Sequence, residues 1–204
     1  PVIERVCRAV SVPVSIDTMK AGVAREAIAA GALVVNDVSG LEADPEMVAT
    51  CAETGVAMVC MHRQGTSATM QENPCYDDVV EEVAGYLERR LDELVSVGID
   101  RERIVLDPGI GFGKNAEQSL DLLKALGWVR GSIEHPLLVG TSRKSFIGAT
   151  TGEPVEDRRF GTAATVALAV QAGADIVRVH DVKEMVRVVK MSDAIVRDGS
   201  EDHA

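Results

Sequence analysis

Short apolar runs alternate along the chain with longer segments in which apolar residues recur at helical spacing. The short runs are rich in Val and Ile, which is typical of strands buried on both faces. They cover Val12–Thr18, Ala32–Ser39, Val56–His62, Ile104–Asp107, Leu137–Ser142 and Ile176–Asp181. The helical patterns cover Ala21–Ala30, Pro45–Thr54, Tyr76–Val97, Glu117–Leu126, Gly161–Ala172 and Lys183–Val196. This alternation predicts an α/β protein in which helices cover a parallel sheet.

Polar residues stand at or near the carboxyl end of every predicted strand. They are Asp17, Thr18, Asn36, Asp37, His62, Asp107, Thr141, Ser142, Arg178, His180 and Asp181. In a closed barrel all of these strand ends meet at one mouth, whereas in an open doubly wound sheet most are too far apart to cooperate. The pattern favours a (β/α)8 TIM barrel, with about six of its eight βα units in this chain. We expect residues 1–204 to form a single barrel domain without two N-terminal units, because Pro1–Val10 looks like the end of a helix.

Charge and composition limit the classes of binding partner that suit this chain. The chain has 204 residues, 46% of them hydrophobic, and a net charge of −11. Such an acidic chain is not suited to nucleic acid or to an anionic membrane surface, because both require a basic face. The four cysteines show no CxxC spacing, and neither a signal peptide nor a long apolar run is present. We therefore expect reduced thiols and a cytoplasmic protein.

The segment DPGIGFGK at Asp107–Lys114 resembles a phosphate-binding loop only at first sight. The residue after Lys114 is Asn115 where a Walker A loop requires Ser or Thr, and the glycine spacing does not match a Rossmann fingerprint. An aspartate at a strand end can instead accept two N–H bonds from an amidine-like ring edge, such as that of a 2-amino-4-oxo pyrimidine. The alternative is an aspartate that only caps a turn or a helix.

Two further segments carry cations. Gly140–Gly148 places Arg143 and Lys144 among hydroxyls at a helix start, where they suit an anion or a ring carbonyl, although a solvated basic turn is the alternative. Strand alternation sends Arg178 and His180 to one face, which is better explained by a phosphate group than by core packing.

A metal site is a weaker interpretation of the same strand ends. Asp17, Asp107, His62 and His180 could ligate a metal, as in barrel hydrolases. However, there is no HxH pair on the first strands, and Arg178 would stand beside the cation.

Five segments together resemble dihydropteroate synthase, a family of pterin-binding barrel enzymes. They are Ser15–Thr18, Asn36–Gly40, Leu106–Lys114, Gly140–Gly148 and Arg178–Asp181, and they follow the family's order and spacing from about residue 2 to residue 199. The Met-Gln-Glu-Asn-Pro stretch at 70–74 also fits the family's long loop after its fifth strand. Pterin-dependent corrinoid methyltransferases share the barrel and the pocket, but the SRKSFIG segment favours the synthase.

The resemblance implies a transferase of folate biosynthesis. Its reaction condenses 6-hydroxymethyl-7,8-dihydropterin pyrophosphate with p-aminobenzoate to give 7,8-dihydropteroate and pyrophosphate. The residues implied around the pterin are Asp17, Asn36, Met61, Asp107, Phe112, Gly140, Lys144 and Arg178. Those implied for the pyrophosphate are Arg178 and His180, and Ser145 borders the p-aminobenzoate site with the Lys144 stem. The catalytic roles fall to Asp107, Lys144 and Arg178.

The resemblance also implies Mg²⁺ as a cofactor, a homodimer and a sulfonamide target. The loops that help bind magnesium in this family follow the first two barrel strands, so we expect no metal ligand in this chain. For the same reason we expect the 204-residue chain to be inactive and poorly folded by itself. A pterin-binding module without turnover and a corrinoid methyltransferase remain as alternatives.

Overall fold

The computed structural model describes residues 1–66, 70, 72 and 74–197, so Gln71 and Asn73 of the 70–74 stretch lie outside the described residues. The chain divides into two compact units. Unit 1 comprises Pro1–Arg63 and Val83–Gly109, and unit 2 comprises Gln64–Glu82 and the chain from Ile110 onward. That residues 1–204 make a single domain stays a prediction.

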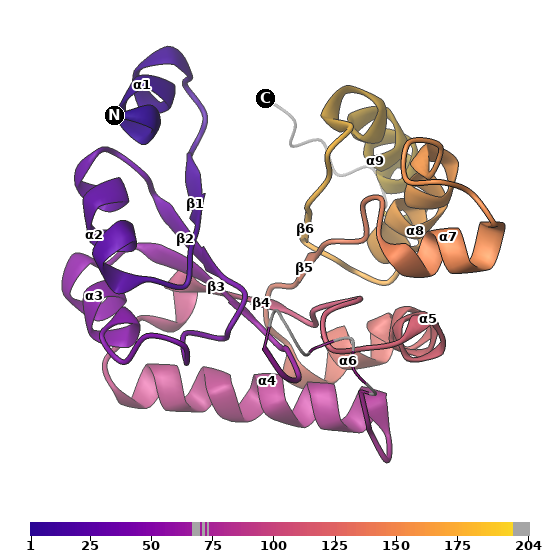
Figure 1. Ribbon diagram of the computed structural model, residues 1–204, viewed down its shortest axis with the longest axis horizontal. Helices are drawn as coiled ribbons and strands as arrows, with labels where there is room; N and C mark the ends of the chain where they lie inside the picture. The colour runs from indigo at the N-terminus through magenta and orange to yellow at the C-terminus, as the bar shows by residue number, and fades with distance from the viewer. Residues whose placement is uncertain (67–69, 71, 73, 198–204) are drawn as a thin grey trace. The chain divides into compact units, whose positions relative to one another are not determined.

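Unit 1 is built on a four-stranded parallel sheet. Its strands β1 (Ser15–Asp17), β2 (Val34–Asp37), β3 (Ala57–Met61) and β4 (Ile104–Asp107) lie in chain order (Figure 1). The register pairs Asp17 with Asn36 and Met61 with Asp107. Parallel pairing therefore brings the predicted polar strand ends to one edge of this sheet.

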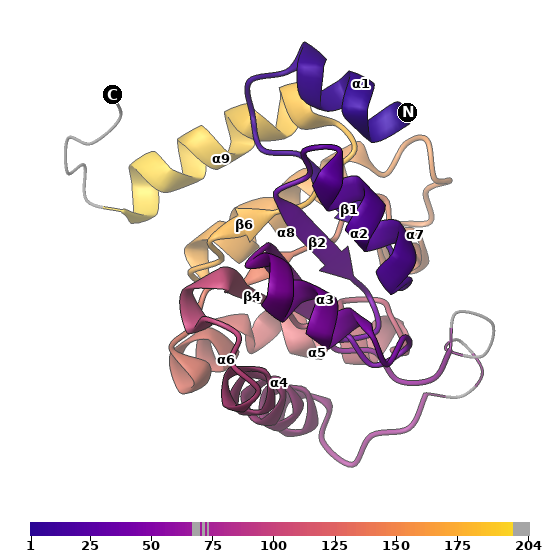
Figure 2. The ribbon, with the colours of Figure 1, turned by 90° about the vertical axis from the view of Figure 1, so that its left-hand side faces the viewer.

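Helices cover the sheet of unit 1. Figure 2 shows α2 (Ala21–Ala29) and α3 (Met47–Thr54) in front of β2, and α1 (Val2–Ala9) precedes β1 in the chain. Central strand residues have almost no exposure, which is typical of parallel strands buried on both faces. Those at 0% exposure are Val35, Met58, Cys60 and Leu106.

Unit 2 contains a two-stranded parallel sheet and most of the remaining helices. Strands β5 (Leu138–Val139) and β6 (Ile176–Val177) pair in register. The helices are α5 (Ala116–Lys124), α6 (Leu126–Ile133), α7 (Ser145–Thr151), α8 (Arg159–Gln171) and α9 (Val182–Val196). Within this unit α8 packs against α9, and α5 against α7. Helix α4 (Val79–Ser96) contains residues of both units, and the short 3-10 helix η1 (Arg101–Arg103) precedes β4.

The structure differs from the sequence-based elements in two ways. Strands β1, β5 and β6 are shorter than predicted, and beyond β5 and β6 the backbone N–H of His180 donates to the Ser142 hydroxyl and not to a backbone oxygen. Helix α6 was missed: the predicted helix Glu117–Leu126 is interrupted at Ala125, and a new helix continues to Ile133.

The predicted number of βα units, about six, is consistent with the structure. In the described residues, six parallel strands are each followed by at least one helix. No helix in that part of the chain is both long and apolar enough to cross a membrane.

Candidate active site

Asp17 and Asn36 meet at the carboxyl ends of β1 and β2. The Asn36 side-chain amide donates to Asp17 Oδ2 at 3.2 Å. Asn36 is 7% exposed, whereas Asp17 is exposed. The pair thus presents carboxylate and amide groups together at one edge of the sheet, as the sequence predicted for unit 1.

Asp107 ends β4 beside Met61 of β3. Its side chain is 7% exposed, and Oδ1 accepts the backbone N–H of Gly109 at 2.7 Å. Asp107 therefore caps its own turn, which is the alternative interpretation of the sequence. This turn contact orients the carboxyl group at the strand end, so it is compatible with a ligand-binding role as well.

Glycine at position 109 is required by the structure. Its φ is 65°, and a Cβ there would lie 1.9 Å from the backbone oxygen of His62. The His62 N–H in turn donates to the backbone oxygen of Asp107 at 2.9 Å. The close approach of these two strand ends sets the direction in which Asp107 leaves the sheet.

Asp37 is a buried carboxylate that we did not predict as a site residue. Its Oδ1 accepts the Ser39 N–H at 2.7 Å and the Ser39 hydroxyl at 2.6 Å, while Oδ2 is buried without a hydrogen-bond partner. Burial raises the pKa of this carboxyl above its ordinary value. The Asp-x-Ser spacing is a turn signal, and it fixes the backbone that follows Asn36.

His62 is packed rather than arranged as a metal ligand. Its ring lies 4.9 Å from the ring of Tyr86 in a T-shaped contact. Among the described residues, no group of three or more His, Cys, Asp or Glu side chains could hold a metal ion. The metal-hydrolase alternative therefore has no ligand set in this part of the chain.

Lys144 and Phe112 come together in unit 2. The Lys144 ammonium lies 4.3 Å from the centre of the Phe112 ring and also donates to the backbone oxygen of Ile110. Ser145 is the exposed first residue of α7. Two of the predicted residues, Lys144 and Phe112, thus lie side by side, and a cation over an aromatic face is a favourable pair.

Arg178 and Gly140 lie side by side just beyond β5 and β6. The Arg178 N–H donates to the backbone oxygen of Val139 at 3.0 Å, and a Cβ on Gly140 would lie 3.8 Å from Arg178 Cβ. Arg178 is exposed, as is His180, which contacts the Ser142 hydroxyl. The predicted cationic strand end is therefore present in unit 2.

Arg143 has a protein partner, which sequence reasoning missed. Its guanidinium binds Asp181 through two hydrogen bonds, of 3.0 and 2.6 Å. These bonds lower the pKa of the Asp181 carboxyl. No local pattern signals this pair, since the two residues lie 38 positions apart.

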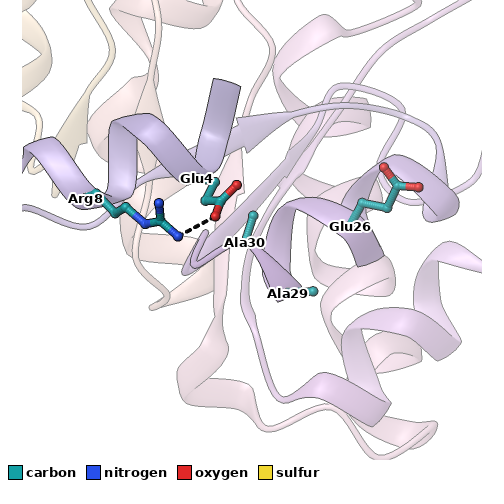
Figure 3. A pocket seen from close by; sticks show the side chains of 5 residues that line it. All are labelled: Glu4, Arg8, Glu26, Ala29 and Ala30. Atoms are coloured by element: carbon teal, nitrogen blue, oxygen red, sulfur yellow. Dashed lines mark hydrogen bonds and ion pairs between the residues drawn. The ribbon is translucent and has the colours of Figure 1, made fainter. Parts of the chain in front are cut away.

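A hollow of about 450 Å³ between α1 and α2 contains none of the predicted residues (Figure 3). It is lined by Glu4, Arg8, Glu26, Ala29 and Ala30. Glu4 and Arg8 form an ion pair one helical turn apart on α1, which is a common surface arrangement.

The sequence of this chain matches a class of pterin-binding proteins. The family model described as "Pterin binding enzyme" matches residues 1–180. The dihydropteroate synthase of Bacillus subtilis (strain 168) is 42% identical over 203 residues, which cover 100% of this chain and 68% of the relative. That of Escherichia coli (strain K12) is 41% identical over 194 residues, or 95% of this chain and 68% of the relative.

Solved structures agree with these relatives. The Yersinia pestis dihydropteroate synthase with a sulfonamide drug superposes with a TM-score of 0.92 at 38% identity, covering 96% of this chain and 70% of that chain. The Xanthomonas albilineans enzyme in complex with 7,8-dihydropteroate gives 0.89 at 39% identity, covering 97% and 72%. This chain belongs to the dihydropteroate synthase family of pterin-binding enzymes. The predicted family, transferase function and barrel fold class are therefore confirmed.

Proposed function

We propose that this chain binds 6-hydroxymethyl-7,8-dihydropterin pyrophosphate and p-aminobenzoate and joins them into 7,8-dihydropteroate. The observation that carries the proposal is the set of acceptors at the strand ends of unit 1, where Asn36 and Asp107 are each 7% exposed and Asn36 contacts Asp17. Structures of the related Xanthomonas albilineans enzyme contain 4-aminobenzoic acid or 7,8-dihydropteroate, which supports these substrates.

Unit 1 supplies the acceptors in this proposal. Asp107 and Asp17 accept N–H groups of the amidine-like pterin edge, and Asn36 both donates and accepts. Met61, in register with Asp107 and 2% exposed, forms an apolar wall for the flat ring. A ring without the N–H edge leaves Asp107 unpaired, and such a mismatch costs several powers of ten in kcat/KM.

Unit 2 supplies the cations. Lys144 donates to the carbonyl side of the ring, with Phe112 beside it and Gly140 leaving room for the Arg178 stem. The guanidinium of Arg178 stacks on the ring and, with His180, binds the pyrophosphate. Ser145 borders p-aminobenzoate at the start of α7.

The proposed step substitutes one bond for another at the pterin methylene carbon. The C–O bond to pyrophosphate breaks, the aryl amine forms the new C–N bond, and the amine then loses a proton. Positive charge grows on the methylene carbon as the anion departs. Fixed carboxylates around the ring favour that charge, while Arg178 and His180 favour the leaving group. No covalent bond to the protein is required.

Magnesium is implied by the family likeness, but the described residues do not fit it. Among them there is no cluster of three or more ligating side chains. The exposed guanidinium of Arg178 at the end of β6 would also oppose a metal there. We therefore derive no step through a metal ion from this part of the chain.

The implied homodimer also belongs to the proposal. Outer helices α8 and α9 carry exposed apolar side chains, which suit a contact with a second copy. They are Phe160, Leu168, Met191 and Ile195. Sedimentation equilibrium over a range of concentrations measures the mass, and a monomer at high micromolar concentration would contradict the dimer.

The decisive experiment adds the substrates in sequence to the 204-residue chain. Calorimetric titration with the pterin pyrophosphate measures binding, and p-aminobenzoate is added afterwards while dihydropteroate and released pyrophosphate are quantified. The proposal predicts both products in equal amounts, and that result would overturn the expectation that the 204-residue chain is inactive by itself. Binding without product supports the alternative of a pterin-binding module, and no binding contradicts the proposal. Preference for a methylated folate, with methyl transfer to a cobalamin protein, would indicate the corrinoid methyltransferase.

A further inference from the structure

Two adjacent side-chain pairs join the segment after β5 to the segment after β6. Ser142 contacts His180, and Arg143 contacts Asp181. We call these four residues the β5–β6 clamp. Lys144 directly follows one side of the clamp, and Arg178 precedes the other side by two residues.

The ion pair of the clamp is well ordered by its surroundings. Arg143 Nε and Nη2 reach the two oxygens of Asp181 at 3.0 and 2.6 Å, and the Asp181 side chain is only 11% exposed. A two-pronged guanidinium–carboxylate contact of this kind fixes direction as well as distance. Arg159 lies 3.9 Å from the same carboxylate and adds a second, weaker attraction.

The backbone of Arg143 is held from two further sides. Its N–H donates to the Thr162 hydroxyl at 3.1 Å, and its carbonyl oxygen accepts from Arg158 at 3.1 Å. Arg143 also has a φ of 58°, which costs free energy for a residue with a Cβ. A strained conformation persists only where its surroundings determine it, and such positions concentrate at functional sites. Lys144 is the next residue, so the fixed backbone of Arg143 determines where the Lys144 side chain starts.

Ser142 contacts both the backbone and the ring of His180. The Ser142 hydroxyl oxygen accepts the backbone N–H of His180 at 3.1 Å and lies 2.9 Å from Nδ1 of the ring. When the hydroxyl donates its own proton to Nδ1, that ring nitrogen acts as the acceptor. A neutral ring then carries its proton on Nε2, which becomes a donor toward an anion.

We propose that Ser142 and Arg143 are positioning residues, which set His180 and Lys144 for the reaction rather than binding a ligand themselves. This inference rests on the proposed function, because His180 and Lys144 are ligands only there. It also changes the role of Arg143, since the sequence placed that cation beside Lys144 as a second anion-binding group. In the structure the guanidinium is occupied by Asp181.

The test is a double-mutant cycle with the variants Arg143→Gln, Asp181→Asn and their combination. Each replacement removes one charge and retains a polar side chain. Steady-state kcat and the KM of each substrate are measured for all four proteins. We expect each single variant to lose about 10- to 100-fold in kcat, the size of effect that a misplacement of about 1 Å produces. The double variant should lose no more than a single one, because both act through one pair.

The matched control is a second arginine–aspartate pair of unit 2, formed by Arg130 and Asp175. Arg130 Nε lies 3.2 Å from Oδ2 of Asp175, which directly precedes β6 and so stands at its opposite end. Arg130→Gln removes a similar pair away from the clamp, and we expect its kcat and KM values to match those of the parent. Equal losses of kcat in Arg130→Gln and Arg143→Gln would mean that the clamp contributes only to stability, and would overturn the inference.

The histidine is tested without any turnover. Nitrogen-15 NMR distinguishes the two ring tautomers, and a His180→Gln spectrum assigns the signal. We expect the parent to carry the His180 proton on Nε2 and Ser142→Ala to shift the population toward Nδ1. An unchanged tautomer in Ser142→Ala contradicts the role of Ser142.

The proposed function and the positioning role of Ser142 and Arg143 would be contradicted by different results. If the parent binds no pterin pyrophosphate and forms no product, the proposed function fails, while the NMR result still tests Ser142. If the parent is active and Arg143→Gln loses only affinity for the anionic substrate, with Asp181→Asn unaffected, Arg143 is a direct ligand and the inference is wrong. Circular dichroism spectra and melting curves verify that each variant is folded.

Discussion

The two units carry their polar strand ends in different ways. In unit 1 the buried carboxylates of Asp107 and Asp37 are held by turns within a few residues, because Asp107 accepts from Gly109 and Asp37 accepts from Ser39. In unit 2 the cationic end is held by pairs between residues 38 positions apart, such as Ser142 with His180. The local turns depend only on residues that are close in sequence, whereas the distant pairs form only after β5 and β6 have paired.

Burial follows the same division. Asn36 and Asp107 are 7% exposed, while Arg178 and His180 are exposed. Burying a polar group costs free energy unless its partners are fixed, so the buried acceptors need nearby backbone donors. Exposed cations remain hydrated until an anion arrives, and a looser arrangement suffices for them. The carboxylates of unit 1 are therefore preorganised by backbone donors, whereas the strand ends of unit 2 are preorganised by side-chain pairs.

The largest effect should come from the acceptor side. We expect Asp107→Asn to weaken binding of the pterin pyrophosphate by about 2–5 kcal/mol, the range for breaking a buried hydrogen-bonded charge pair. The reason is that the amide presents a donor toward the N–H edge of the ring. Calorimetry with the pterin pyrophosphate and with the pterin lacking pyrophosphate measures the change, which should be similar for both ligands.

A variant of the cationic residue Arg178 provides a comparison for this prediction. Arg178→Met retains an apolar stem but not the charged guanidinium, so it should weaken binding of the ligand that carries pyrophosphate more than binding of the pterin without it. Unchanged pterin affinity in Asp107→Asn would remove Asp107 from the acceptor set. Equal loss for both ligands in Arg178→Met would mean that the arginine acts on the ring alone.

An intermediate effect should come from the turn that holds Asp107. In Gly109→Ala the left-handed backbone costs about 1–2 kcal/mol. The new Cβ would also overlap the His62 oxygen at 1.9 Å, so the total loss of unfolding free energy should be larger. Urea unfolding measures it, and the pterin affinity should fall as well, because Asp107 loses its orientation.

Gly55→Ala is the matched control, since Gly55 has nearly the same φ, 64°, and a Cβ on it would meet nothing within 4 Å. It should show the conformational cost alone and leave pterin affinity unchanged. Similar losses in the two variants would indicate that contact with His62 is unimportant.

The smallest effect should appear at Asp37. Because burial raises the folded-state pKa of this carboxyl, its stabilising contribution is complete below the unfolded pKa of about 3.9 and is lost as pH rises through the folded pKa. Asp37→Asn does not titrate there and keeps an acceptor for Ser39. Its unfolding free energy relative to the parent should therefore increase over that window.

Urea unfolding of both proteins from about pH 3 to about pH 8, at constant ionic strength, covers that window and provides the measurement. A difference that stays flat with pH would show that Asp37 has an ordinary carboxyl. A difference that falls with rising pH would mean that the folded state favours the charged form.

Several elements could be predicted from the sequence because their signals are local. Strand β4 begins and ends where its apolar run and Asp107 predicted. Helix α6 was missed because Leu126 to Ile133 contains two glycines and a tryptophan, a weak helical pattern that packing overrides. Strands β5 and β6 were predicted too long, since alternation continues through His180 although the ladder does not.

The order of the six strands, their polar ends and the family can be predicted from the sequence, because each depends on residues that are neighbours in the chain. The contacts of Asn36 with Asp17, of Arg143 with Asp181 and of Ser142 with His180 become visible only in the folded chain. Those partners depend on which strands pair and in what register. Hydrophobic spacing predicts that strands exist, but the contacts between distant side chains follow from the packing of the whole unit.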